Sequence, residues 1–227
     1  MSTALEFTEA IPRNIARNLD GQVIHVWRIP YAMAQRRTPL LELLAAYLDT
    51  PASSVVLDED ARGKPRLASR VSASGAADRL EFNWSHSGAF ALVALARGCA
   101  LGVDIERFGK GQRSLEIARR FFDPAEADAL ARLEPAARDR SFIKLWCAKE
   151  AVLKAAGEGL SFGLARLAFV QRADADWSLQ QVDPALGEAP DWRLASFEAA
   201  APDYRGALAW HGPSRAIAAF RTTGAAD

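Results

Sequence analysis

The sequence predicts a protein of the α+β class, with one long helix around which the strands are organised. Apolar residues recur at helical spacing through the stretch 142–157, and Gly157 ends it as a helix-stop signal. Segments of strand length lie on both sides of this helix, at 22–29 and repeatedly between 165 and 221. The class therefore follows from one clear helical period and several short apolar segments separated by turn residues.

Composition describes an ordinary globular chain. It has 227 residues, of which 50% are hydrophobic and 25% charged, and its 28 basic residues balance its 28 acidic ones. That balance argues against a general nucleic-acid or membrane-surface binder. The two cysteines form no metal-ligand spacing, and no run of about 18 apolar residues occurs. We expect a soluble, unexported, cytoplasmic protein.

The N-terminal part begins with a strand and a helix. Residues 22–29 alternate as a strand does, and Thr38 followed by Pro39 predicts a helix with Thr38 as N-cap. Arg36 and Arg37 come just before that helix. They could reach a bound anion, or they could be ordinary loop arginines.

A polar turn covers residues 58–66 and contains Gly63-Lys64-Pro65. Turn chemistry alone explains a glycine followed by a proline. The same loop also carries three basic residues, including Lys64, and could clamp a phosphate. Both interpretations stay open.

Paired strands are predicted at 80–84 and 89–96, joined by Ser85-His86-Ser87-Gly88. Serine and glycine suit a tight connection for backbone reasons. A protonated His86 would add a cation that a phosphate can use. The residues alone do not choose between the two.

An apolar strand is predicted at 100–106, with two acidic residues near its end. Asp104 and Glu106 are two residues apart, so their carboxylates share one face, opposite Val103 and Ile105. Like charges side by side repel, and a divalent cation such as Mg²⁺ makes such a pair favourable. The alternative is a strand end that runs out into solvent.

Two further helices and five strands complete the pattern. A helix is predicted at 114–122, and Asp123, Pro124 and Glu126 have the form of a capping box that begins another. The predicted strands that follow the long helix are 165–171, 177–182, 192–198, 204–211 and 215–221.

The long helix concentrates lysine. The chain has five lysines, and three of them, Lys144, Lys149 and Lys154, lie in this helix. Lys149 falls at the edge of the apolar stripe, where a charge needs a partner. Glu150 and Lys154 lie one turn apart on neighbouring surface. An exposed ion pair on a half-buried core helix would explain them, and so would a site that binds an anion and a metal.

Taken together, these stretches resemble the Sfp-type 4′-phosphopantetheinyl transferases. The matching pieces occur in that family's order, and they are Gly63-Lys64-Pro65, Phe82 to Ser87, Gly102-Val103-Asp104-Ile105-Glu106, Arg120-Phe121-Phe122 with Glu126, and Trp146-Cys147-Ala148-Lys149-Glu150 with Lys154 and Gly157. The GVDIE and WxxKExxxKxxG pieces are specific in combination, and GKP alone is weak.

The resemblance implies two similar α/β halves, 1–101 and 102–227, related by a pseudo-two-fold axis with the active site in the cleft between them. It also implies the reaction. Coenzyme A would give its phosphopantetheine arm to a serine of an apo acyl, peptidyl or polyketide carrier protein, and adenosine 3′,5′-bisphosphate would leave. The expected cofactor is Mg²⁺, and the expected state is a monomer that binds neither nucleic acid nor membrane.

The resemblance also implies roles for individual residues. The expected Mg²⁺ ligands are Asp104, Glu106 and Glu150. The expected coenzyme A contacts are Lys154 and Lys149 at the pyrophosphate, Ser85 and His86 at the 3′-phosphate, Gly63, Lys64 and Pro65 at the adenine, and Arg37 at a phosphate. The expected catalytic residues are Lys154, Glu150 and Glu126, with Glu150 preferred as general base and Glu126 mainly a helix-start residue.

Two other functions fit the same residues. A Mg²⁺-dependent phosphohydrolase would also use paired carboxylates and a lysine, but it would release a phosphate product to water. A non-catalytic coenzyme A-binding module would bind the coenzyme without changing the mass of any carrier protein. Which carrier is served is left open by the sequence.

Overall fold

The computed structural model describes residues 5–68, 78–109, 113–172, 176–200 and 202–222, and it has the mixed α/β class that the sequence predicts. Its α-helices are α1 (Pro12–Ala16), α2 (Thr38–Leu48), α3 (Ser114–Phe121), α4 (Pro124–Ala131) and α5 (Pro135–Ala156). Its strands are β1 (Thr8–Glu9), β2 (Val23–Pro30), β3 (Leu57–Glu59), β4 (Pro65–Leu67), β5 (Leu80–Ser87), β6 (Phe90–Arg97), β7 (Leu101–Arg107), β8 (Leu167–Gln171), β9 (Trp177–Val182), β10 (Trp192–Ala200), β11 (Tyr204–His211) and β12 (Ala216–Arg221). No helix of these residues is long and apolar enough to cross a membrane.

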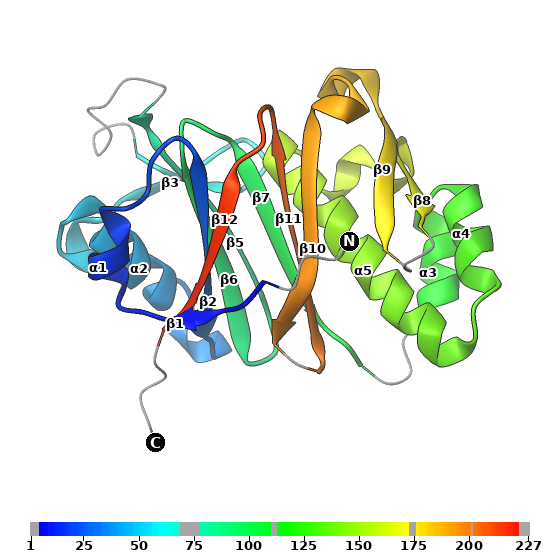
Figure 1. Cartoon of the computed structure of the whole chain (residues 1–227), viewed down its shortest axis with the longest axis horizontal. Coiled ribbons are helices and arrows are strands. Elements are labelled where there is room, and N and C mark those ends of the chain that lie inside the picture. Colours follow the sequence, from blue (N-terminus) through cyan, green and yellow to red (C-terminus); the bar gives the residue numbers. More distant parts are fainter. Residues whose placement is uncertain (1–4, 69–77, 110–112, 173–175, 201, 223–227) are drawn as a thin grey trace.

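Two sheets pack face to face in the middle of the molecule (Figure 1). One has five strands in the order β1-β12-β2-β6-β5, and the other has three in the order β10-β11-β7. Apolar side chains from both sheets, such as Val26, Leu92, Val103 and Leu208, form the core between them. Helix α2 covers the outer face of the larger sheet, and α5 covers that of the smaller sheet.

The last strand, β12, lies in a sheet with strands from the N-terminal part of the chain. β12 pairs in parallel with β1 and with β2, so residues 216–221 belong to the sheet of the N-terminal half. Residues 102–227 therefore do not pair all of their strands among themselves. The division near residue 101 and the pseudo-two-fold relation between the halves remain predictions.

The predicted elements are present with shifted ends. The strands expected at 22–29 and after 164 are β2 and β8 to β12, and the capping box of Asp123 and Glu126 begins α4 as expected. Thr38 is not an N-cap: it is the first helical residue of α2, and Arg37 before it makes no side-chain cap bond. Helix α5 begins at Pro135, two turns before the predicted start. The periodicity does not reveal these first two turns, because they are polar and lack apolar residues at helical spacing.

Strand β7 is buried on both faces, which excludes a strand end in solvent for Asp104. Val103 and Ile105 point into the core between the sheets, as the alternation predicts. The opposite face is covered by α5, so the side chain of Asp104 is only 3% exposed. A carboxylate enclosed in this way needs a partner.

Candidate functional site

The site begins with a close approach of α5 to β7 at Gly102. A Cβ atom at this position would overlap the backbone of Ala151 and Ala155. Only glycine therefore lets the helix lie this near the strand. Asp104 and Glu106 follow Gly102 on the same face of β7, so the contact places both carboxylates against the last turns of α5.

Lys154 of α5 meets the first of these carboxylates. Its Nζ lies 2.6 Å from Oδ1 of Asp104 and donates to Oγ of Ser85 at 3.1 Å. Ser85 in turn donates to the same Oδ1 at 2.8 Å. Burial lowers the pKa of Lys154, but Asp104 more than offsets it, and the net pKa is raised. The ammonium therefore stays charged within this triangle of α5, β5 and β7.

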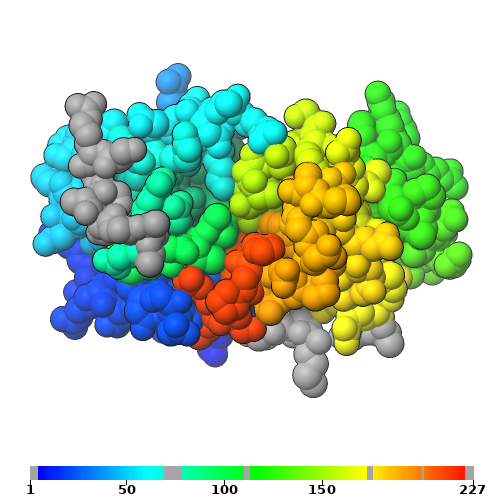
Figure 2. Space-filling model, turned by 90° about the horizontal axis from the view of Figure 1, so that it is seen from above, coloured from blue at the N-terminus to red at the C-terminus, as the bar shows by residue number. Residues whose placement is uncertain are grey.

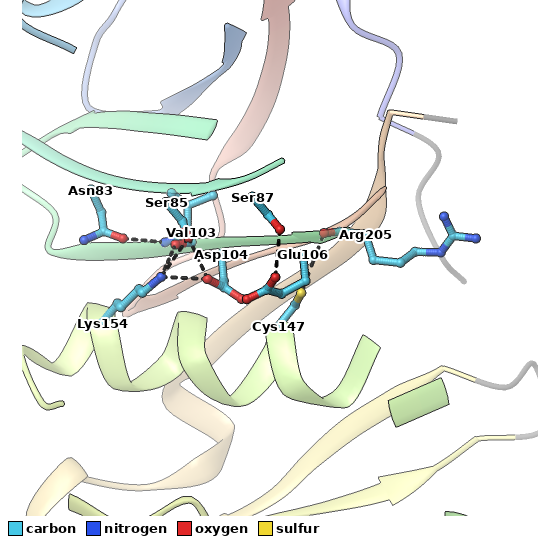
Figure 3. Close-up of polar contacts among 9 residues, drawn as sticks. All are labelled: Asn83, Ser85, Ser87, Val103, Asp104, Glu106, Cys147, Lys154 and Arg205. Carbon is cyan, nitrogen blue, oxygen red and sulfur yellow. Dashed lines mark hydrogen bonds and ion pairs between the residues drawn. The ribbon is translucent and has the colours of Figure 1, made fainter. Parts of the chain in front are cut away.

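Strand β5 supports β7 through its side chains rather than its backbone (Figure 3). Asn83 accepts from the backbone N–H of Val103 at 2.8 Å, and Ser87 donates to Oε2 of Glu106 at 2.9 Å. With Ser85 they occupy alternate positions on one face of β5. The larger sheet thus carries a row of polar side chains that joins it to the smaller one.

The three acids repel one another. Burial raises the pKa of Glu150 to about 7; Asp104 and Glu106 add to the rise and Lys154 opposes it. The pKa of Glu106 is also raised, by burial and then by Asp104. One ammonium does not neutralise this group, which therefore favours taking up a proton or a cation.

Two buried carboxylate oxygens have no hydrogen-bond partner, Oδ2 of Asp104 and Oε1 of Glu150. Buried polar atoms are rarely left this way. The site offers oxygen donors, which suit Mg²⁺. As they stand, no three acidic, histidine or cysteine side chains of the described residues are gathered closely enough to hold one ion. The donor type and the orphaned oxygens nevertheless fit a hard divalent cation.

Lys149 lies inside the C-terminal core. Its side chain is 0% exposed, and its Nζ lies 2.8 Å from Oε2 of Glu126, which is also 0% exposed. The ammonium also donates to the backbone oxygens of Leu164 and Leu167. The contact with a pyrophosphate that the resemblance implies for Lys149 stays a prediction; in this structure a closed ion pair inside the C-terminal core uses its charge.

Glu126 is likewise enclosed. Beyond its ion pair with Lys149, one oxygen accepts from the backbone N–H of Phe169 at 2.8 Å and the other from that of Asp123 at 3.1 Å. Burial raises the pKa of Glu126 and lowers that of Lys149. The contacts of Glu126 are therefore more extensive than the capping box alone, and they do not include Asp104, Glu106 or Glu150.

The Gly63-Lys64-Pro65 turn lies against the end of α5. The Nζ of Lys64 donates to the backbone oxygen of Lys154. Arg37 lies beside this turn, where its guanidinium is 2.6 Å from Oε1 of Glu59. The predicted contacts of these residues with coenzyme A stay predictions.

Ser85 and His86 point to opposite faces of β5, because the strand continues to Ser87. Ser85 joins Asp104, whereas the His86 ring stacks on Tyr31 with ring centroids 4.4 Å apart. Burial, and then Lys154, lowers the pKa of His86. The two residues expected at one phosphate thus present themselves from different sides of the strand.

Sequence reasoning missed three members of this site. The motif that contains Gly102 indicates no packing role for this glycine, and no motif indicates a role for Asn83 or Ser87. A signal existed: polar residues at 83, 85 and 87 have the period of a strand with one polar face. Because the predicted strand ends at 84, it does not include this period; β5 continues to Ser87.

Comparison with known proteins identifies similar chains. Residues 100–209 match the family model described as the 4′-phosphopantetheinyl transferase superfamily. A Synechocystis protein whose name assigns it to the 4′-phosphopantetheinyl transferases is 36% identical over 160 residues, which cover 70% of this chain and 61% of that protein. The transferase HetI of Nostoc is 35% identical over 156 residues, covering 68% and 60%. A Bacillus subtilis 4′-phosphopantetheinyl transferase is 35% identical over 104 residues, covering 46% and 45%.

The matched residues of this chain span between 45% and 61% of the length of those relatives. The matched region 100–209 contains the three acids and Lys154, whereas Lys64, Ser85 and His86 precede it. The resemblance read from the motifs is confirmed.

Proposed function

We propose that this chain, whose residues 100–209 belong to the 4′-phosphopantetheinyl transferase superfamily, is an enzyme that transfers the phosphopantetheine arm of coenzyme A to a serine of a carrier protein. Adenosine 3′,5′-bisphosphate is the second product. The observation that carries the proposal is the contact of Lys154 with Asp104 beside two orphaned carboxylate oxygens, all within the matched region. The proposed active site lies where β5, β7 and the last turns of α5 meet.

Phosphoryl transfer depends on positioning and on neutralising charge more than on covalent chemistry. Lys154 supplies a fixed positive charge whose distance from Asp104 is set by the packing at Gly102. An ammonium held in a partly dry site stabilises charge that develops on the departing bisphosphate. Ser85 holds the lysine in place through its hydroxyl.

Asp104, Glu106 and Glu150 would hold the Mg²⁺. When bound, the ion supplies Lewis-acid polarisation of the pyrophosphate and stabilises the leaving oxygen. The orphaned oxygens of Asp104 and Glu150 support this assignment, since a cation would satisfy both.

Glu150 is also the proposed general base. A carrier serine must lose its proton as it attacks, and the ideal acceptor has a pKa near the working pH. Glu150 lies one turn before Lys154, which places it near the pyrophosphate that Lys154 is proposed to contact. Burial raises the pKa of Glu150 to about 7 in the metal-free protein, and a bound Mg²⁺ would lower it. Glu126 is not proposed for this role, because Lys149 and two backbone N–H groups occupy its oxygens.

Mass spectrometry of apo carrier proteins tests the proposal. Acyl, peptidyl and polyketide carriers are incubated with coenzyme A, Mg²⁺ and this protein. A gain of one phosphopantetheine group on a serine is the expected result. Release of a phosphate product without any change in carrier mass would instead identify a phosphohydrolase. Binding of coenzyme A with neither outcome would identify a binding module.

A further inference from the structure

The loop 60–64 of the N-terminal half holds the end of α5. The guanidinium of Arg62 lies 2.7 Å from Oε2 of Glu158 and donates to the backbone oxygen of Gly157 at 3.1 Å. The Nζ of Lys64 donates to the backbone oxygen of Lys154. Figure 2 shows this contact from above, where the cyan residues near 60 meet the yellow-green end of α5.

The loop is shaped before it makes these contacts. Oδ1 of Asp60 accepts from the backbone N–H groups of Arg62 and Lys64, both at 2.9 Å. These hydrogen bonds are the main reason that the pKa of Asp60 is lowered, so the carboxylate stays charged. Gly63 has φ +80°, a left-handed conformation that glycine adopts without strain. Both cations are thereby directed toward α5.

The helix end needs what the loop supplies. The last carbonyl groups of a helix have no partner within it, and cations near that end are favourable. Gly157 turns the chain in the left-handed conformation, and the N–H of Glu158 returns to the oxygen of Leu153 at 2.8 Å. Arg62 and Lys64 add cations from the other half of the molecule. The backbone that Lys64 holds is that of Lys154, whose ammonium contacts Asp104.

We propose that Arg62 and Lys64 are positioning residues, which together form a latch that holds the Glu150–Lys154 turn against β7. The proposal rests on the proposed function for its consequence in catalysis. It assigns Lys64 a different role from a contact with the adenine of coenzyme A, because its ammonium is directed at the helix backbone. Arg62, outside the motifs that carry the family resemblance, gains a role that the sequence did not indicate.

Hydrogen exchange and steady-state kinetics on the whole chain test the latch together. Peptides covering 150–160 report on the amides of Gly157 and Glu158 in Arg62→Gln and Lys64→Met. Both variants should speed this exchange by about two- to fivefold, as expected for the loss of one partly exposed ion pair or one hydrogen bond to the helix backbone. The kcat for carrier modification should fall by about tenfold with the KM for coenzyme A unchanged, since displaced catalytic groups slow the chemical step.

Matched variants separate the latch from a general loss of charge. Arg66→Gln removes the same charge from an exposed neighbour on β4 and should change neither exchange nor kcat. Lys64→Arg keeps a donor and should recover most of the activity. Exchanging the pair, with Arg62→Glu and Glu158→Arg in one chain, should restore protection of the helix end.

Two results would overturn the proposal. Unchanged exchange in Arg62→Gln and Lys64→Met would mean that the loop does not hold the turn. A raised KM with kcat preserved in Lys64→Met would make Lys64 a contact to coenzyme A. If the unmodified protein changes no carrier, the proposed function fails, while the exchange rates still decide the latch.

Discussion

Lys149 and Glu126 form an ion pair with no exposed surface, and their charged atoms lie 2.8 Å apart. The pair ties α5 to the start of α4, and through Phe169 it reaches β8. Rings of Phe122 and Phe169 lie 5.1 and 5.3 Å from the ammonium and close the pocket around it. A charge in such a place stabilises the fold only while its partner remains.

Glu126→Gln should therefore destabilise the protein strongly. Glutamine can still accept from the backbone N–H of Asp123, but it leaves Lys149 as an uncompensated buried cation. Breaking a buried pair from one side costs about 3–5 kcal/mol. Urea unfolding measures the loss. Glu116→Gln, in an exposed pair with Arg113, is the control and should stay within about 0.5 kcal/mol of the unmodified protein. Equal stability of the two variants would show that the buried pair is not important.

Gly102→Ala should separate helix from strand. The added Cβ would overlap the backbone of Ala151 and Ala155, and overpacking of this kind costs about 1–3 kcal/mol. Activity should fall further than stability, because Lys154 moves away from Asp104. Gly21→Ala is the matched control, since nothing lies within 4 Å of a Cβ there. Carrier-modification rates and melting temperatures of both variants are the measurements. A Gly102→Ala protein as active as Gly21→Ala would remove the close approach from the account.

His25 should make the free energy of unfolding fall when the pH is lowered below 6.5. Its Nδ1 lies 2.7 Å from the Tyr47 hydroxyl, which also accepts from Nε1 of Trp27. Burial lowers the pKa of His25 from 6.5 to about 4. Between these values the unfolded chain binds more protons, so stability rises with pH from about 4 to 6.5, by about 3 kcal/mol at most.

Unfolding free energies of the unmodified protein and His25→Gln across that range measure this contribution. Their difference should grow as the pH rises to 6.5 and then level off. A difference that is flat with pH would mean that His25 titrates alike in both states.

When no metal is bound, Glu150 should have the opposite effect on stability: the free energy of unfolding should fall as the pH rises. Its folded pKa of about 7 lies above the ordinary value of 4.5, so the folded state holds the extra proton between them. Stability is then lost as pH rises through that window. Glu150→Gln removes this loss and should unfold at a higher temperature than the unmodified protein at pH 7.5 in the presence of a chelator. Added Mg²⁺ should stabilise the unmodified protein more than the variant. A variant that melts lower at pH 7.5 would contradict the assignment of a strained, unneutralised carboxylate.

Local sequence patterns predict much of this structure, but they do not predict which residues far apart in the chain contact each other. The capping box of Asp123 and Glu126 is a local signal, and it was readable because both residues lie within one turn. The buried partner of that same Glu126 is Lys149, 23 positions further along the chain, and no spacing rule connects them. Arg62 and Gly157 are 95 positions apart. From the sequence, a lysine of the long helix could face the core or the acids of β7. Tertiary packing decides which: Lys149 pairs with Glu126 in the core, and Lys154 pairs with Asp104.

The carboxylate face of β7 was predictable for a simpler reason. Strand alternation fixes Asp104 and Glu106 on one side whatever lies across from them. That α5 covers this side, rather than water, depended on the packing at Gly102. The same alternation places Ser85 and His86 on opposite faces, because β5 continues to Ser87 and not only to Trp84.

Asp104→Asn tests the central claim most directly. The amide keeps the shape of the side chain and can still accept from Ser85, but it removes the charge that holds Lys154 and would hold the metal. The measurement is the intact mass of an apo carrier protein after incubation with coenzyme A, Mg²⁺ and either the unmodified protein or the variant. The account predicts that the unmodified protein adds one phosphopantetheine group and that Asp104→Asn, still folded by its melting temperature, adds almost none. Modification by Asp104→Asn at the rate of the unmodified protein would contradict it.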